Sequence, residues 1–432
     1  MTSRPMRGAG GRVAAASLPG DCGRRIGGYG EPMKQLALLA LMLLVGRLSA
    51  QTLEQADVFP FGMDGVKVYR IPGLLVTPKG TLLAYCEARR DGKSDWGEIE
   101  VRMRRSVDGG ATWSAATQLG HHGPRLEGNP HKKTGGEKEQ TVNNPVMVAD
   151  RETGVITLLY CVNYARAFLC RSTDDGLTWS APTEITAVFE PFRKYQDWKV
   201  IATGPGHGIQ LKSGRLVVPV WLAYGKVGDH GPSFAGTIVS DDRGLTWQAG
   251  EVAMPNQPEL GGPNESVVAE LSDGRVMLVS RTVAKPNRKL VAYAADGATG
   301  WTKPAFHADL WEPVCMASLT TLARPSPTLL FSAPRRVAVD KAGQEIPGGR
   351  GKRENLTVMV STDDGRTWPV SRTLEAGPSA YSDLGSHGEK NLLSLRRFGG
   401  NPVGAFRPRV VEGQIRAARG QVDTTARGQG VV

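Results

Sequence analysis

The sequence has few of the residues that build metal sites and disulfide frameworks. Its 432 residues include only five cysteines and seven histidines. The cysteines form no Cys-x-x-Cys pair, and neither they nor the histidines show the spacing of a zinc site. We therefore expect no bound metal and no cofactor. Cys161 and Cys170 lie on neighbouring strand-like runs, so they could form a disulfide in an oxidising compartment or remain buried free thiols.

No apolar run in the sequence is long enough to span a membrane. The ten residues of 36–45 are all apolar, but they would cross only about half of a bilayer core. Lys34 precedes this run and Leu48-Ser49-Ala50 follows it, which is the pattern of a secretory signal peptide. We predict a translation start at Met33, cleavage after Ala50, and a secreted or periplasmic protein with no stable membrane span.

The body of the chain has little net positive charge, although the whole sequence has a net charge of +11. Residues 1–50 hold seven basic and two acidic residues, and residues 385–432 hold eight and three. Each end therefore carries +5, which leaves a net +1 for residues 51–384. A nucleic-acid-binding domain usually carries its charge on the folded body. We expect no nucleic-acid partner.

Glycine and proline are abundant, with 54 and 28 residues. The glycines have no period of three, which excludes collagen. A chain so rich in both residues favours many short strands joined by turns over a helical bundle. We therefore predict an all-β protein.

Four copies of the octapeptide Ser-x-Asp-x-Gly-x-Thr-Trp begin at Ser106, Ser172, Ser240 and Ser361, and a degenerate copy covers 294–301. A fixed period of about 60 residues, with several strand-like runs in each unit, indicates the blades of a β-propeller. The Asp, Gly and Thr of each copy suit a hairpin turn, because Asp accepts backbone N–H groups and Gly supplies a left-handed conformation. We predict a six-bladed β-propeller of four-stranded antiparallel blades.

The octapeptides resemble the Asp-box repeats of the sialidase superfamily, and the resemblance extends over residues 55–384. In that family the Asp-boxes are structural turns, which implies that their aspartates are not catalytic. We divide the chain into a leader and signal peptide (1–50), a catalytic propeller (51–384) and an atypical Arg/Gly-rich tail (385–432). The tail is either disordered or the product of an altered reading frame that removes strands needed to close the last blade.

Several arginines match the family's carboxylate-binding positions. Tyr69-Arg70-Ile71-Pro72 resembles the Arg-Ile-Pro motif of sialidases, in which the arginine binds the carboxylate of sialic acid. The resemblance implies the same role for Arg281, sixteen residues after Glu265, and for Arg353 at the start of the strand before the last Asp-box. It also implies that Arg89 is an additional arginine near the substrate carboxylate.

The resemblance further implies three catalytic residues. Asp95 occupies the loop before the first Asp-box, where the family has its general acid/base, and Asp91 is a less well placed rival. Tyr381 in Gly377–Leu384 corresponds to the nucleophile, and Glu265 to the base that activates it. Glu270 lies close by, but in the half of its strand nearer the turn.

These residue types suit one reaction. Three guanidiniums can bind the carboxylate on the anomeric carbon of sialic acid, and a neutral phenol avoids the repulsion that a carboxylate nucleophile would meet there. The resemblance implies an exo-sialidase that retains configuration and acts on sialylated glycoproteins, glycolipids or oligosaccharides. Three alternatives stay open, namely a non-catalytic propeller that binds glycans or proteins, a glycosidase for a related 2-keto sugar acid, and a trans-sialidase.

Overall fold

The computed structural model describes residues 54–413, apart from gaps at 61, 91, 93, 122–125, 127–139, 226–229, 323–327, 347–348, 388–389 and 397–407. The chain divides into two units, Met1–Thr52 and Leu53–Val432, and every described residue belongs to the second. The predicted leader, signal peptide and cleavage site, and the rival acid Asp91, lie outside the described residues.

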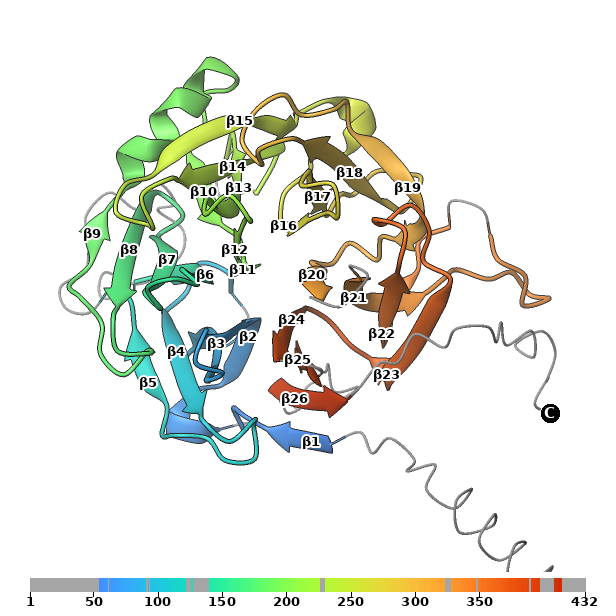
Figure 1. Ribbon diagram of the computed structural model, residues 1–432. Coiled ribbons are helices and arrows are strands. Elements are labelled where there is room, and N and C mark those ends of the chain that lie inside the picture. Colours follow the sequence, from blue (N-terminus) through green and yellow to red (C-terminus); the bar gives the residue numbers. More distant parts are fainter. Residues whose placement is uncertain are drawn as a thin grey trace, which may run out of the picture. The chain divides into compact units, whose positions relative to one another are not determined.

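The described strands form six sheets arranged around a common centre (Figure 1). Four of them are four-stranded, and three of these four are built from consecutive strands. The first contains β2 (Val68–Val76), β3 (Leu82–Arg89), β4 (Ile99–Ser106) and β5 (Thr117–Leu119). The second contains β16 (Ser266–Glu270), β17 (Val276–Ser280), β18 (Arg288–Ala294) and β19 (Ala305–Trp311). The third contains β20 (Ser318–Leu322), β21 (Thr328–Arg336), β22 (Lys352–Ser361) and β23 (Val370–Pro378).

Two further sheets have five strands each. One contains β6 (Val142–Ala149), β7 (Ile156–Val162), β8 (Arg166–Ser172), β9 (Thr183–Glu184) and β11 (Gly206–His207), and the other contains β10 (Val200–Thr203), β12 (Ile209–Gln210), β13 (Leu216–Ala223), β14 (Ser233–Ser240) and β15 (Gln248–Met254). The strands β11 and β6 pair in parallel. The prediction of four-stranded antiparallel blades is therefore wrong for these two sheets, because the segment around 200–210 adds short strands to both.

The remaining sheet joins strands from distant parts of the chain. It has the order β1 (Glu54–Asp57), β26 (Pro408–Gly413), β25 (Lys390–Arg396) and β24 (Ser382–His387). The all-β propeller is confirmed, but the blades built within 68–378 number five, one fewer than the six predicted. Strands β25 and β26 lie inside the segment 385–432, whose description as a separate tail stays a prediction.

The helices of the described residues are short 3-10 turns, η1 (Met63–Gly65), η2 (Thr186–Lys194) and η3 (Pro258–Leu260). Within the described part of the chain, no helix combines the length and the apolarity that a membrane crossing requires.

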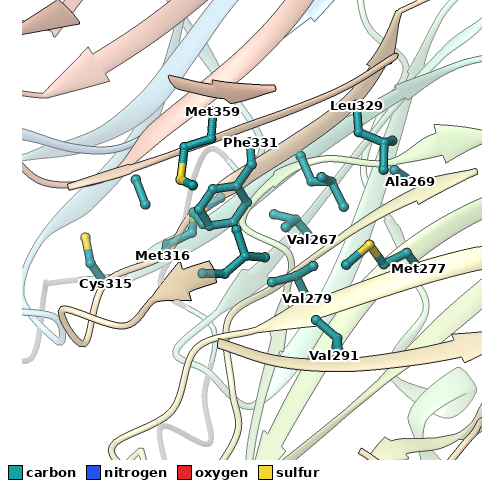
Figure 2. Packing of buried hydrophobic residues seen from close by; sticks show 14 of the residues in the cluster. Val267, Ala269, Met277, Val279, Val291, Cys315, Met316, Leu329, Phe331 and Met359 are labelled. Carbon is teal, nitrogen blue, oxygen red and sulfur yellow. The ribbon is translucent and has the colours of Figure 1, made fainter. Parts of the chain in front are cut away.

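The hydrophobic core lies between neighbouring sheets. In one cluster, Val267 and Met277 of the β16–β19 sheet pack with Leu329, Phe331 and Met359 of the next sheet (Figure 2). Both faces of the central strands are covered in this way, so their sequences are almost continuously apolar rather than alternating. Each large side chain buried here contributes about 1.5–3 kcal/mol to the free energy of unfolding.

The four cysteines among the described residues, Cys86, Cys161, Cys170 and Cys315, are buried and free. The antiparallel pairing of β7 with β8 places Cys161 opposite Ala167, whereas Cys170 lies opposite Leu158. The two thiols are therefore three positions apart along the ladder, and the free-thiol alternative of the sequence analysis holds.

Each complete Asp-box is a hydrogen-bonded turn. In the last one, Asp363 accepts the backbone N–H of Thr367 at 3.0 Å and its hydroxyl at 2.6 Å, and Ser361 Oγ accepts the N–H of Gly365 at 2.9 Å. Gly365 has a φ of 77°, and a Cβ there would lie 2.9 Å from Met277 Sδ on the neighbouring sheet. The turn thus joins adjacent blades and has no part in the cavity described below.

Replacing Asp363 with Ala is expected to lower stability and leave catalysis intact. The variant loses the acceptor of three hydrogen bonds in one turn, and we expect a fall of about 2 °C or more in the melting temperature. The catalytic efficiency of the folded variant should stay within about twofold of the parent. Thr362→Ala, an exposed change in the same turn, is the control and should alter neither quantity.

Candidate active site

One cavity of about 210 Å³ collects every site residue predicted from the sequence. The residues come from different sheets. Asp95 lies in the loop between β3 and β4, and the others lie at or near the end of a strand. The lining contains Arg70, Arg89, Asp95, Glu265, Arg281, Arg353 and Tyr381, together with Ile71, Asn144, Tyr164, Trp221, His230 and Asn264. Four arginines face two carboxylates in this lining, so the cavity has an excess of positive charge and favours an anionic ligand.

A β-bulge in β2 positions Arg70. The pairing of β2 with β3 shifts between Arg70 and Gly73, and Ile71 has a φ of 54°. Pro72 has no N–H to donate and so tolerates this interruption of the ladder. A β-branched residue with positive φ is uncommon, and such strain is typical of bulges that aim a side chain next to a functional site.

Asp95 lies between two arginines. Arg89 Nη1 donates to Asp95 Oδ1 at 2.5 Å, and Arg70 Nη1 donates to the same oxygen at 3.3 Å. Desolvation raises the pKa of this carboxyl, but Arg89 and Arg70 together hold the pKa below its ordinary value. The Asp95 side chain remains 40% exposed, so a ligand can reach it.

Glu87 is a fully buried acid that the sequence analysis did not identify as functional. It accepts hydrogen bonds from Arg89 Nη2 at 2.6 Å and from the backbone N–H of Asn144 at 2.9 Å. Burial raises the pKa of Glu87, although Arg89 opposes this effect. The Arg89 guanidinium is thus fixed between Glu87 and Asp95.

Tyr381, Glu265 and Arg281 form a second hydrogen-bonded group. The Tyr381 hydroxyl donates to the Glu265 carboxylate, whose two oxygens each lie 2.7 Å away. Arg281 Nη1 donates to Tyr381 Oη at 2.7 Å and to Glu265 Oε2 at 2.6 Å. Burial raises the pKa of Tyr381, while the neighbouring Arg281 opposes the rise. A base in direct contact with this phenol is therefore needed to ionise it near neutral pH.

The hairpin of β16 and β17 brings Glu265 and Arg281 together, as their spacing predicts. The backbone N–H of Arg281 donates to the Glu265 carbonyl at 2.9 Å, directly beyond the last ladder pair. Glu270 lies at the opposite end of β16, where its carboxylate accepts the backbone N–H of Lys212. It does not line the cavity.

Arg353 reaches the cavity from β22. Its Nη2 donates to the carbonyl of Val314, and its guanidinium carbon lies 5.7 Å from the centre of the Tyr381 ring. Arg70, Arg281 and Arg353 therefore approach the cavity from three different sheets. Such convergence suits a planar anion, because each guanidinium offers a fork of N–H donors.

An aromatic wall of Tyr164, Trp221 and His230 lines part of the cavity, and sequence reasoning missed it. The His230 ring stacks on Trp96 with centroids 5.2 Å apart and lies 4.9 Å from Tyr164 and 5.4 Å from Trp221. Burial lowers the pKa of His230, which favours its neutral form at neutral pH. The loop position of Trp96 beside Asp95 was the one available signal, because the other three residues belong to no recognisable motif.

The Asp383 carboxylate joins four sheets. Its Oδ2 accepts the backbone N–H of Leu74 at 2.8 Å, and its Oδ1 contacts His207 Nδ1 at 2.7 Å and Ser318 Oγ at 2.8 Å. Asp383 follows Tyr381 by two residues, so this network holds the strand that carries the phenol. Burial lowers the pKa of His207, but the contact with Asp383 raises it by more. The net effect is a pKa above the ordinary value of 6.5.

This pair makes stability depend on pH with a defined sign. Because the folded-state pKa of His207 is raised, its contribution is complete below about pH 6.5 and is lost as pH rises through the folded pKa. We expect His207→Gln to cost about 1.5–3 kcal/mol at pH 5.5 and less at pH 8.5. Urea unfolding at both pH values measures the difference, and a cost that grows with pH would contradict this account.

Comparison with known proteins adds to this geometry. Residues 128–392 match the family model of the BNR repeat-like domain. A sialidase of Micromonospora viridifaciens is 31% identical over 351 residues, which cover 76% of this chain and 50% of that protein. A sialidase of Bacteroides fragilis is 30% identical over 343 residues, which cover 72% and 56%. The chain thus spans about half the length of these two curated relatives.

Solved structures also resemble this chain. The Hadza microbial sialidase Hz136 has a TM-score of 0.67 and 27% identity, with 84% of this chain and 68% of that chain covered. The Trypanosoma rangeli sialidase has a TM-score of 0.61, with 84% and 60% covered. Its identity is only 19%, so that likeness concerns the fold alone.

Proposed function

The chain belongs to the sialidase superfamily of BNR repeat-like proteins, and on that premise we propose that it is an exo-sialidase. It would hydrolyse terminal sialic acid from glycoproteins, glycolipids or oligosaccharides. The observation that carries the proposal is the hydrogen-bonded group of Tyr381, Glu265 and Arg281 in an arginine-lined cavity. A binding module needs neither a phenol nor a base in contact with it.

The first role is substrate binding. Arg70, Arg281 and Arg353 would hold the carboxylate on the anomeric carbon of sialic acid through charge-assisted hydrogen bonds. This carboxylate fixes the sugar, so the anomeric carbon is presented to Tyr381 in one orientation. Part of the binding energy is thereby converted into alignment of the reacting atoms.

The second role is nucleophilic attack. Glu265 would take the phenolic proton as Tyr381 Oη bonds to the anomeric carbon, and Arg281 would stabilise the charge that develops on the oxygen. A neutral phenol approaches the substrate carboxylate without the repulsion that an aspartate or glutamate would meet.

The third role is proton transfer by Asp95. It would protonate the aglycone oxygen as that bond breaks, and then deprotonate the water that releases the sugar from Tyr381. Arg89 and Arg70 keep the pKa of Asp95 low in the free protein, which opposes this acid role. A substrate carboxylate bound to Arg70 adds negative charge and raises the pKa of Asp95. The acid is thus formed as substrate binds. Two displacements at one carbon retain its configuration.

Release of free sialic acid from sialyllactose tests the proposed function. The same assay with a glycoside of a related 2-keto sugar acid distinguishes that alternative. Isotope-labelled lactose, added as an acceptor, reveals transfer because it becomes labelled sialyllactose. Turnover of sialyllactose to free sialic acid supports the proposal. Binding of sialyllactose without turnover by the folded protein would instead favour the glycan-binding propeller.

We also propose that the sheet of β1 and β24–β26 is the sixth blade and closes the ring. Strand β25 pairs with β24 along the whole of Ser382–His387, directly after Tyr381. In this sheet, β26 pairs with both β25 and β1, so it links the two ends of the propeller. Secretion through the predicted signal peptide is likewise proposed, and the N-terminal sequence of exported protein would test it.

Ending the chain after His387 is therefore expected to abolish folding. The shortened protein loses β25 and β26 and leaves β24 without its ladder partner. A chain ending after Gly413 keeps both strands and is the matched control. We expect the shorter form to be insoluble or to lack a cooperative melting transition, whereas the control melts like the full chain. Equal melting of both forms would exclude this sheet as a required blade.

A further inference from the structure

A buried ion pair outside the cavity joins a segment next to Arg281 to a segment that contacts Arg353. Lys289 lies on β18 and Glu312 directly follows β19, and each residue is 1% exposed. Lys289 Nζ lies 2.8 Å from Glu312 Oε2. Such a pair is poor evidence for stability, because the cost of removing two charges from water offsets their attraction. Its hydrogen bonds to the surrounding chain indicate a different role.

The Glu312 carboxylate ties two loops together. Its Oε2 accepts the backbone N–H of Thr282 at 3.1 Å, and its Oε1 accepts that of Cys315 at 2.9 Å. Lys289 Nζ donates to the carbonyl of Cys315. One carboxylate and one ammonium therefore fix the backbone at Thr282 and at Cys315.

Both fixed positions adjoin cavity arginines. Thr282 directly follows Arg281, whose guanidinium contacts Tyr381. Cys315 directly follows Val314, whose carbonyl accepts the hydrogen bond from Arg353 Nη2. Val314 has a φ of 59°, which a β-branched residue adopts only when its surroundings hold it there.

We propose that Lys289 and Glu312 are positioning residues that set the spacing of Arg281 and Arg353 for a carboxylate ligand. The inference rests on the proposed function, since it takes the ligand to be a sialic acid. The two arginines belong to different sheets. The ion pair joins the backbone next to Arg281 to the loop whose Val314 carbonyl accepts the hydrogen bond from Arg353. Without it, each guanidinium keeps its charge but loses its fixed position relative to the other.

The double variant Lys289→Met/Glu312→Gln tests this role. It removes both charges, leaves no unpaired buried ion, and leaves one amide oxygen in place of the two carboxylate oxygens that accept from Thr282 and Cys315. The readout is the ratio of inhibition constants for the 2,3-unsaturated sialic acid analogue and its methyl ester, which differ in the carboxylate alone. We expect the preference of the parent protein for the free acid to fall by about tenfold in the variant.

The control is Arg105→Met, which removes an ion pair with Asp175 that lies outside the cavity. It should keep the preference of the parent. If the folded double variant also keeps the preference within twofold, the pair is merely structural and the inference is overturned. If the double variant does not fold, Glu312→Asp gives the same comparison, because it keeps both charges but draws the carboxylate away from the N–H groups of Thr282 and Cys315. A parent protein with no preference for the acid would refute the proposed function itself.

Discussion

Tyr381→Phe is expected to lower kcat/KM for an α-sialoside by about 10³-fold or more while the protein stays folded. The change removes one oxygen, which is the atom that accepts from Arg281 and donates to Glu265. The ring still fills its place in the core cluster. Without the phenol, no group in contact with the Glu265 base can form the covalent intermediate.

Initial rates with a fluorogenic α-sialoside measure this effect, and thermal unfolding checks the fold. Tyr160→Phe is the matched control, because it removes a buried hydroxyl outside the cavity and should leave the rate unchanged. Activity of Tyr381→Phe within tenfold of the parent would exclude the tyrosine as nucleophile.

Asp95→Ala is expected to have an effect that depends on the leaving group. A sugar leaving group needs a proton as the bond breaks, so kcat/KM for sialyllactose should fall by about 10²–10⁴-fold. An aryl leaving group carries negative charge more readily, so kcat/KM for an aryl sialoside should fall much less. The parameter kcat/KM reports the first chemical step, which separates this role from the later activation of water.

Glu98→Ala is the control for Asp95, because Glu98 is a half-buried carboxylate of the same loop that does not line the cavity. It should lower neither rate. An equal loss on both substrates in Asp95→Ala would mean that the residue acts through Arg70 and Arg89 rather than by proton transfer.

Local chemistry explains what could be predicted from the sequence. The Asp-box residues form their turn from contacts within eight positions, so Asp363 and Thr367 identify it without knowledge of the rest of the chain. The same holds for Glu265 and Arg281, because one hairpin with a short turn determines their separation. The family resemblance then selected residues that the folded chain brings to one cavity.

Contacts between distant segments explain what could not be predicted. The pairing of β1 with β26 joins residues at opposite ends of the described chain, and no local pattern marks it. The aromatic wall depends on how separate loops meet, so Tyr164 and His230 carried no signal of their own. The role of Glu87 could not be predicted for another reason. A charged residue in an apolar strand can be assigned a role only when its partner, here Arg89, is known from the structure.

The most direct test of the account is to follow the hydrolysis of an α-sialoside by NMR and identify the first anomer of free sialic acid. Two displacements through Tyr381 predict that the α-anomer appears first and the β-anomer follows by slow mutarotation. Initial release of the β-anomer would mean a single displacement by water and would contradict the tyrosine mechanism. No release from the folded protein would contradict the assignment as a sialidase.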